Sequence, residues 1–179
     1  MAKKKNYVNN KDLLNALIEY RANVAEAENA GDKVPQVPNY IGECIYLIAT
    51  RLATKPNFSG YSYKEDMISD GIENCLQYIH NFNPEKSQNP FAYFTQIIWY
   101  AFLRRIQKEK KQMYIKFKSS QALMTQINIM DSDGGEIQMQ EPPEYINEFI
   151  DEFEGKLKAK KKEADDKKLE AEEKIDIEE

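Results

Sequence analysis

The chain has 179 residues, which suits one domain with tails, and it combines 41% hydrophobic with 31% charged residues. Its net charge of −5 argues against a simple basic DNA-coating protein. The charge is unevenly distributed. Residues 103–118 hold seven Lys or Arg against one Glu, a local charge of +6, whereas residues 141–179 hold eight Lys against fifteen Asp or Glu, a local charge of −7. This segregation indicates a basic working surface and an acidic tail.

Familiar catalytic and metal-binding patterns are missing from the sequence. Cys44 and Cys75 lie far apart on apolar stretches, which favours two reduced core thiols in an intracellular chain. The single histidine, His80, is expected to cap a helix end. The sequence has no CxxC pair, Walker glycine loop, GxSxG or HExxH. We therefore expect no enzyme, no catalytic residues, no metal and no cofactor. We also expect no signal peptide and no membrane span, because no apolar run approaches ~20 residues.

The first half of the chain predicts three helices. Asn9 or Asn10 caps a helix over 11–30, which Gly31 ends, and two prolines then form a linker. A second helix, over 39–54, is apolar around much of its circumference and should be central. A loop, PNFSGYSY, separates it from a third helix over 63–79. The inner stripe of that third helix is Met67, Ile68, Ile72, Cys75, Leu76 and Ile79.

The opposite face of the third helix is acidic and polar. Its residues are Glu65, Asp66, Ser69, Asp70 and Glu73. Such a face is either solvated surface or a docking surface for a basic partner. Gly71 in the middle of this helix costs about 1 kcal/mol relative to alanine, which indicates a close approach of another backbone.

The segment 89–111, NPFAYFTQIIWYAFLRRIQKEKK, predicts a helix capped by Asn89 with Pro90 at its first position. Helical periodicity gives it two stripes. The core stripe is Phe94, Ile98, Ala101 and Arg105, and the second stripe is Tyr93, Gln96, Tyr100, Arg104, Lys108 and Lys111. Aromatic rings stack on unpaired bases and cations hold phosphates, so the second stripe predicts a nucleic-acid face. The alternative is a core helix with a solvated basic end.

The remaining residues predict less structure. We expect a loop over 119–143, with a short hairpin near Ile127–Met130, and then a helix over 144–162. The charged, low-complexity end is expected to be solvated helix or disorder. The predicted organisation is an N-terminal helix and linker (1–38), a helical domain (39–118) and a tail segment (119–179). The fold class is all-α, a compact helical bundle with a flexible charged C-terminal tail.

Several of these motifs, in this order, resemble a known family. DMISDGI, HNF and NPFAYFTQ…FLRRIQKEKK resemble the central domain (region 2) of bacterial sigma factors, and most closely the late-transcription sigma factors of T-even-type bacteriophages. The N-terminal NYVNNKDLL also resembles the phage family, and the match covers about residues 6–111. The resemblance implies transcription initiation in the cytoplasm of an infected bacterial cell.

The resemblance implies two surfaces. The third helix would bind the clamp-helix coiled coil of the largest subunit of the host RNA polymerase core, through Glu65, Asp66, Ser69, Asp70, Ile72, Glu73 and Leu76. The fourth helix would recognise an AT-rich −10-like promoter element and hold its melted non-template strand. Tyr93, or Phe94 with a one-residue gap in the connector, falls where the family places the ring that supports strand opening. The other implied DNA contacts are Gln96, Ile97, Tyr100, Arg104, Arg105, Lys108 and Lys111.

The resemblance also implies an accessory contact, because late phage sigma factors rely on a DNA-bound sliding clamp for activation. The hydrophobic-acidic segment EYINEFIDEF would carry it through Tyr145, Phe149, Ile150 and Phe153. A coactivator is a further candidate partner. Two other interpretations remain open. One is an adaptor of the coactivator or anti-sigma kind, which binds polymerase or a clamp without promoter recognition. The other is a general helical DNA-binding module that acts without polymerase.

Overall fold

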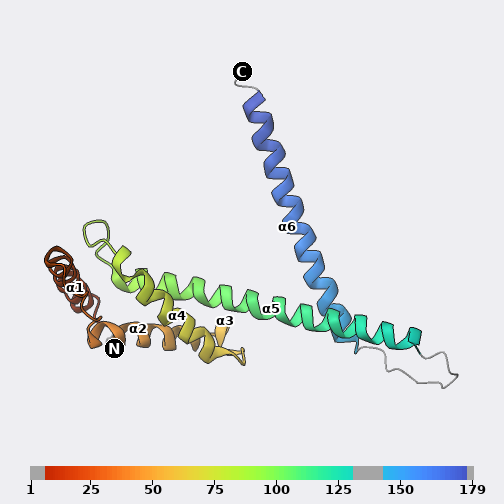
Figure 1. Cartoon of the computed structure of the whole chain (residues 1–179), viewed down its shortest axis with the longest axis horizontal. Helices are drawn as coiled ribbons and strands as arrows, with labels where there is room; N and C mark the ends of the chain where they lie inside the picture. Colours follow the sequence, from red (N-terminus) through yellow and green to blue (C-terminus); the bar gives the residue numbers. More distant parts are fainter. Residues whose placement is uncertain (1–6, 131–142, 177–179) are drawn as a thin grey trace, which may run out of the picture. The chain divides into compact units, whose positions relative to one another are not determined.

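The computed structural model describes the backbone of residues 7–130 and 143–176, and the side chains of residues 7–123 and 143–166. Every element in these ranges is helical (Figure 1), so the all-α prediction is confirmed. The helices are α1 (Asn10–Ala30), α2 (Asn39–Ala53), α3 (Pro56–Ser59), α4 (Lys64–Tyr78), the 3₁₀ turn η1 (Ile79–Asn81), α5 (Pro90–Met130) and α6 (Glu144–Asp176). Among the described helices, none combines the length and apolar character needed to cross a bilayer.

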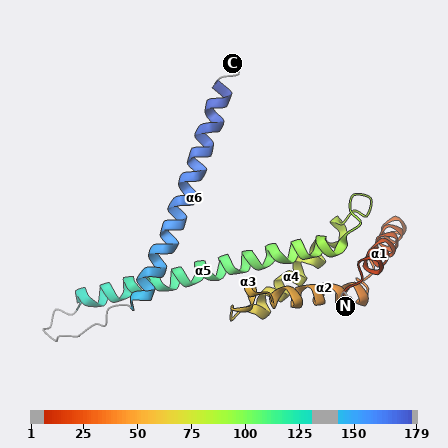
Figure 2. The same cartoon turned by 180° about the vertical axis from the view of Figure 1, so that it is seen from behind.

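The chain forms two compact units, Met1–Gln107 and Lys108–Glu179, and α5 runs from the first into the second. This division differs from the predicted boundaries after residues 38 and 118. Helix α1 belongs to the first unit because it packs on α2 and buries Leu13 and Leu17 in the common core. Figures 1 and 2 show the molecule from opposite sides, and in both views α4 lies beside the first part of α5.

Local signals set the ends of α1. The side-chain oxygen of Asn9 accepts a hydrogen bond from the Lys11 N–H at 3.1 Å, as an N-cap does. Gly31 ends the helix in the left-handed conformation, with φ of 73°, which glycine adopts without strain. Arg21 of α1 also donates to the backbone carbonyl of Phe82, so α1 is tied to the turn that precedes α5.

Helix α2 lies at the centre of the first unit, as its all-round apolar sequence predicts. Ile41, Ile45 and Ile48 are buried, and α2 packs against α1, α3 and α4. The segment after α2 was expected to be a loop, but it contains the one-turn helix α3. Its Phe58 is buried and meets Trp99 and Phe102 edge to face, with ring centroids 4.8 and 5.1 Å away.

Helix α4 buries a narrower stripe than expected. The buried line is Met67, Gly71, Cys75 and Ile79, one residue per helical turn. A Cβ atom added to Gly71 would lie 3.1 Å from Ile98 Cγ2 and 3.2 Å from Phe102 Cε1. The close approach expected at this glycine therefore comes from α5 side chains. Leu76 is 41% exposed, because it lies one residue past the line of closest approach.

Helix α5 begins as predicted, with the Asn89 side chain accepting from the Ala92 N–H at 3.1 Å. It continues to Met130, so the loop and hairpin expected from residue 119 are wrong as far as Met130. Residues 119–130 contain neither proline nor glycine, so nothing in this stretch stops the helix. The rest of the expected loop, residues 131–142, lies outside the described residues.

The second unit is built from the C-terminal part of α5 and from α6. The Tyr114 and Phe153 rings stack with centroids 4.6 Å apart, and Phe117 meets Phe149 at 5.6 Å. Further along, Gln121 donates to Asn147 at 2.7 Å. The contacts therefore follow opposite chain directions along the two helices, which cross at an angle (Figures 1 and 2). Helix α6 continues to Asp176, so the charged stretch after residue 162 is helical as far as that residue, which is the first of the two predicted alternatives.

Candidate nucleic-acid interface

Three of the predicted DNA-binding side chains in the first unit are exposed on α5. They are Gln96, Tyr100 and Arg104. Tyr100 is 52% exposed, so about half of this residue's surface is open to solvent. A polar amide, an open ring and a guanidinium on one helix provide hydrogen bonding, stacking and charge for an unpaired strand. We call these three residues the α5 outer surface.

Tyr93, the residue first expected to provide the promoter-opening ring, is held in place. Its hydroxyl donates to the backbone carbonyl of Tyr78 at 2.8 Å. Its ring lies 5.2 Å from that of Phe82 and 5.3 Å from that of Phe94. Burial, and secondarily the nearby Cys75 thiol, raise the pKa of the Tyr93 hydroxyl. Tyr93 is therefore half buried, and Tyr100 is the more accessible ring for stacking.

Two other predicted contacts turn toward the core. Phe94 is 0% exposed, so it cannot touch a nucleic acid while α5 is packed, and of the two candidate rings only Tyr93 reaches the surface. Ile97 is half buried against the core cluster. Periodicity explains both positions, because Phe94 lies at the centre of the buried face of α5 and Ile97 lies at its edge.

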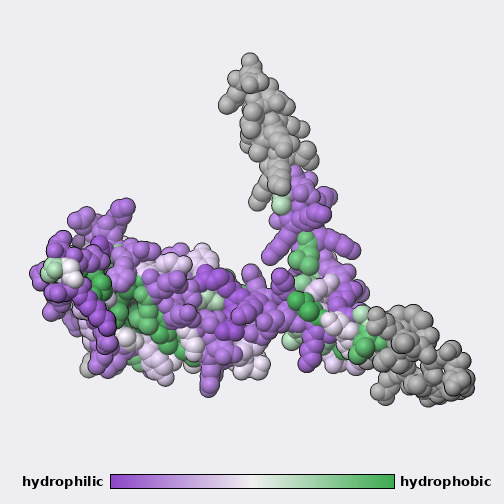
Figure 3. All heavy atoms as spheres, viewed as in Figure 1, coloured by the Kyte–Doolittle hydropathy of each residue, from purple (hydrophilic) through white to green (hydrophobic). Residues whose placement is uncertain are grey.

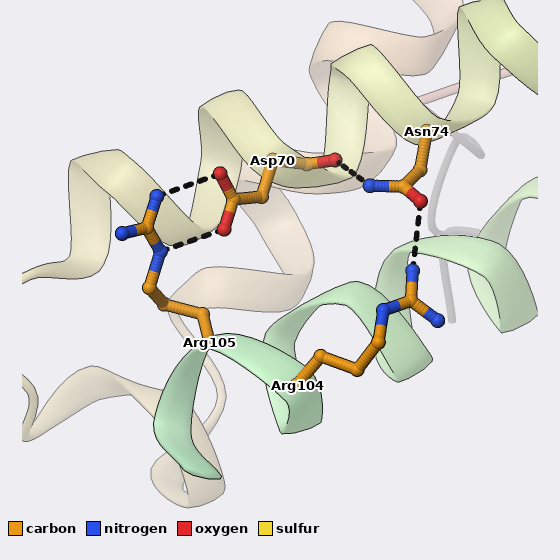
Figure 4. A network of polar contacts seen from close by, with 4 residues as sticks. All are labelled: Asp70, Asn74, Arg104 and Arg105. Atoms are coloured by element: carbon orange, nitrogen blue, oxygen red, sulfur yellow. Dashed lines mark hydrogen bonds and ion pairs between the residues drawn. The ribbon is translucent and has the colours of Figure 1, made fainter. Parts of the chain in front are cut away.

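A polar network joins α4 to α5 (Figure 4). Arg105 donates from Nε and Nη2 to the two carboxylate oxygens of Asp70, at 2.6 and 2.7 Å. Asn74 donates to the Asp70 backbone carbonyl at 2.6 Å and accepts from Arg104 at 2.7 Å. The side chains of this bidentate pair are 18% exposed for Arg105 and 29% exposed for Asp70. The pair therefore helps to fix the position of α4 relative to α5.

The network engages two residues for which other roles are predicted. Asp70 was expected on the polymerase-docking face and Arg105 on the DNA face, but in the structure they bind each other. Arg104 keeps an exposed position and is held by Asn74. Asn74 was not among the sequence candidates. The sequence feature that could have identified Asn74 is its spacing, because it lies one helical turn after Asp70 on α4 and so shares its face.

The other predicted docking residues lie on α4 outside the network. Glu65, Asp66, Ser69 and Glu73 are exposed, and Leu76 beside them is exposed apolar surface. Ile72 is half buried against the core. We call the four exposed polar residues the α4 acidic face. Its four members, three of them carboxylates, suit a basic partner.

The two predicted lysine contacts, Lys108 and Lys111, belong to the second unit, where both are exposed on α5. The residues proposed for sliding-clamp binding lie in the same unit on α6. Ile150 is 3% exposed, and Phe149 and Phe153 pack their rings on Phe117 and Tyr114. Tyr145 remains exposed. All four residues proposed for clamp binding are engaged within the chain, because Ile150 is buried and the rings of Tyr145, Phe149 and Phe153 each lie against a ring of α5.

No protein-family model matches this chain, and a comparison with curated proteins finds no match. The chemical character of the described surface must therefore carry the functional argument. On the face that Figure 3 shows, hydrophilic residues cover most of the described surface, and hydrophobic residues emerge in narrow bands.

Proposed function

We propose that the protein is a small sigma factor of the late phage type. In this proposal the α4 acidic face binds the host RNA polymerase core, and the α5 outer surface holds the non-template strand of an AT-rich −10-like element. The polymerase supplies the catalytic chemistry. The sequence resemblance to sigma region 2 supports the proposal, since it assigns these same two helices to polymerase and to DNA.

One observation carries the proposal. An exposed acidic face and an exposed aromatic-cationic surface occur on two helices that are locked together by the Asp70–Arg105 pair and by the close contact at Gly71. A rigid pair of this kind can hold DNA at a fixed position relative to a polymerase docked on the neighbouring helix. AT-rich DNA with TA steps unstacks easily, so a single exposed ring and one cation suit such an element.

The α5 part of the proposal is tested by promoter opening. The experiment follows the reactivity of unpaired thymines to permanganate in the presence of host core polymerase. We expect Tyr100→Ala with Arg104→Ala to abolish opening. The matched control is Tyr46→Ala with Lys55→Ala, which removes an exposed ring and an exposed cation from another part of the first unit. Equal opening by the two double variants would refute the DNA role of the α5 outer surface.

The α4 part is tested by co-migration with core polymerase. Asp66→Lys with Glu73→Lys reverses charge on the α4 acidic face, and we expect it to abolish the complex. Glu26→Lys with Glu28→Lys makes the same charge change on exposed positions of α1 and should leave the complex intact. Stable polymerase binding without strand opening by the wild-type chain would favour an adaptor. Strong duplex binding with no polymerase complex would favour a general DNA-binding module.

A further inference from the structure

Helix α6 is acidic overall, but it contains a short segment of concentrated positive charge. Residues 144–154 contain five acidic residues and no basic one, whereas residues 156–162 contain five lysines and no acidic residue. All five lysines are exposed. The C-terminal part of α5 is also basic, with Lys108, Lys110 and Lys111 exposed on its surface.

The second unit brings these two basic runs together. The stack of Tyr114 on Phe153 lies at one end of the contact between its helices, which continues through Phe117 to Gln121. Because the contacts follow opposite chain directions along the two helices, lower residue numbers on α5 and higher numbers on α6 extend from the same side of the stack. Helix α6 moves away from α5 along this direction (Figure 1). Lys110 and Lys111 lie within about one turn of Tyr114, and Lys158 lies within about two turns of Phe153.

Charged groups on the two helices also interact electrostatically. The pKa of the Glu152 carboxyl on α6 is lowered mainly by Lys156, its hydrogen-bonding neighbour, and additionally by Lys110 of α5. We define the lysine surface as Lys108, Lys110, Lys111, Lys158, Lys160, Lys161 and Lys162. Seven exposed lysines on two contacting helices offer a polyanion several attractive contacts at once, although Glu109 and Glu163 lie beside them in the sequence.

The chemistry of this surface selects among polyanions. Lysine is depleted from protein–protein interfaces, whereas it is a common phosphate ligand in protein–DNA contacts. A membrane-bound helix needs a free apolar face, but Phe149 and Phe153 of α6 are already packed on α5. Dense phosphate charge along a duplex matches a lysine run that spans several turns of helix.

We propose that the lysine surface is a second DNA contact, which binds the phosphate backbone of duplex DNA without sequence specificity. The inference rests on the proposed function only in taking DNA as the polyanion. It assigns to α6 a role that neither the acidic composition of the tail nor the resemblance supplies. In this arrangement the first unit provides sequence preference, and the second unit provides salt-sensitive affinity.

The test measures binding of the full chain to a labelled duplex of random sequence over a series of salt concentrations, without polymerase. The variant is Lys158→Gln with Lys161→Gln and Lys162→Gln. The matched control is Lys33→Gln with Lys55→Gln and Lys86→Gln, which lowers the net charge equally at exposed positions elsewhere. Lysine and glutamine have similar helix propensities, so α6 should be retained in the variant, as circular dichroism would check.

We expect the α6 variant to bind more weakly and to lower the slope of log affinity against log salt by about 2–3, at roughly 0.9 per lost phosphate contact. The control should keep the wild-type slope. Equal losses in both triple variants, or no loss in the α6 variant, would overturn the proposal. Tighter binding to anionic lipid vesicles or to polyglutamate than to duplex DNA at equal salt would also overturn it. Because polymerase and promoter are absent, failure of promoter opening and failure of this contact are separate results.

Discussion

Gly71 offers the sharpest test of how α4 and α5 are held together. In a helix interior, replacing glycine by alanine gains roughly 0.8–1.0 kcal/mol of propensity. At this position the new Cβ would meet Ile98 at 3.1 Å and Phe102 at 3.2 Å, closer than nine in ten real Cβ contacts. Both neighbours are themselves fully buried, so neither can retreat easily. Overpacking of this kind costs about 1–3 kcal/mol. We therefore expect Gly71→Ala to destabilise the first unit by about 1 kcal/mol.

Gly42 provides the matched control within the same unit. It lies inside α2, and an added Cβ would meet nothing within 4 Å. Gly42→Ala should therefore stabilise the protein by about 0.5–1 kcal/mol. Urea unfolding followed by fluorescence of the single tryptophan, Trp99, reports on this unit. With m of about 1–3 kcal/mol/M, each effect moves the midpoint by a few tenths of a molar or more. If Gly71→Ala raised the midpoint as much as Gly42→Ala, the close-packing argument would fail.

Three further predictions concern single contacts. Arg105→Lys should cost about 1–2 kcal/mol in urea unfolding, since the pair with Asp70 is bidentate and partly buried; a double-mutant cycle with Asp70→Asn that gave no coupling would contradict this. Burial raises the pKa of the Cys75 thiol to about 12, so peptide mapping should find Cys75 unlabelled by thiol reagents near neutral pH until urea is added. The stability that its neutral thiol contributes should be fully present below the ordinary thiol pKa and fall as pH rises above it toward the raised pKa of about 12. Hydrogen bonding from Lys118 lowers the pKa of the Glu154 carboxyl, so the stability it contributes is present above the ordinary glutamate pKa and lost as pH falls through the lowered value. An acid titration of helicity should therefore show a smaller loss in Glu154→Gln than in the wild type, and identical titrations would count against this pair.

Local sequence signals predicted the start and end of α1 and the start of α5 well. Asn9, Gly31, Asn89 and Pro90 each act through their own backbone conformation or a hydrogen bond within one turn. Such signals need no knowledge of the rest of the fold. The central position of α2 followed in the same way from apolar residues around its circumference. These features could be read from short windows of the chain.

Sequence reasoning failed where a helix end depends on context. Helix α5 runs to Met130 because no breaker interrupts it, although its run of charged residues ends at Lys118. Helix α3 forms in a presumed loop because Phe58 finds a buried place between Trp99 and Phe102, more than forty residues later in the chain. Tertiary packing decides both outcomes, and local propensity carries little of that information.

The candidate site likewise combines features that the local sequence predicts with features that depend on tertiary packing. Periodicity placed Gln96, Tyr100 and Arg104 on the exposed side of α5, as the structure has them. It could not reveal that Arg105 pairs with Asp70, which is 35 residues away, or that the Tyr93 hydroxyl is bound to the Tyr78 carbonyl. Those contacts require the relative position of two helices, which a single-helix pattern does not contain.

The most direct test of the central claim is run-off transcription with purified host core polymerase and the full chain. The template carries an AT-rich −10-like element in a premelted bubble, and a scrambled element serves as the control template. Our account predicts initiation on the AT-rich template alone, and its loss when Tyr100 and Arg104 are both replaced by alanine. Equal transcription from both templates, or none from either with the wild-type protein, would contradict the proposal that this chain is a sigma factor.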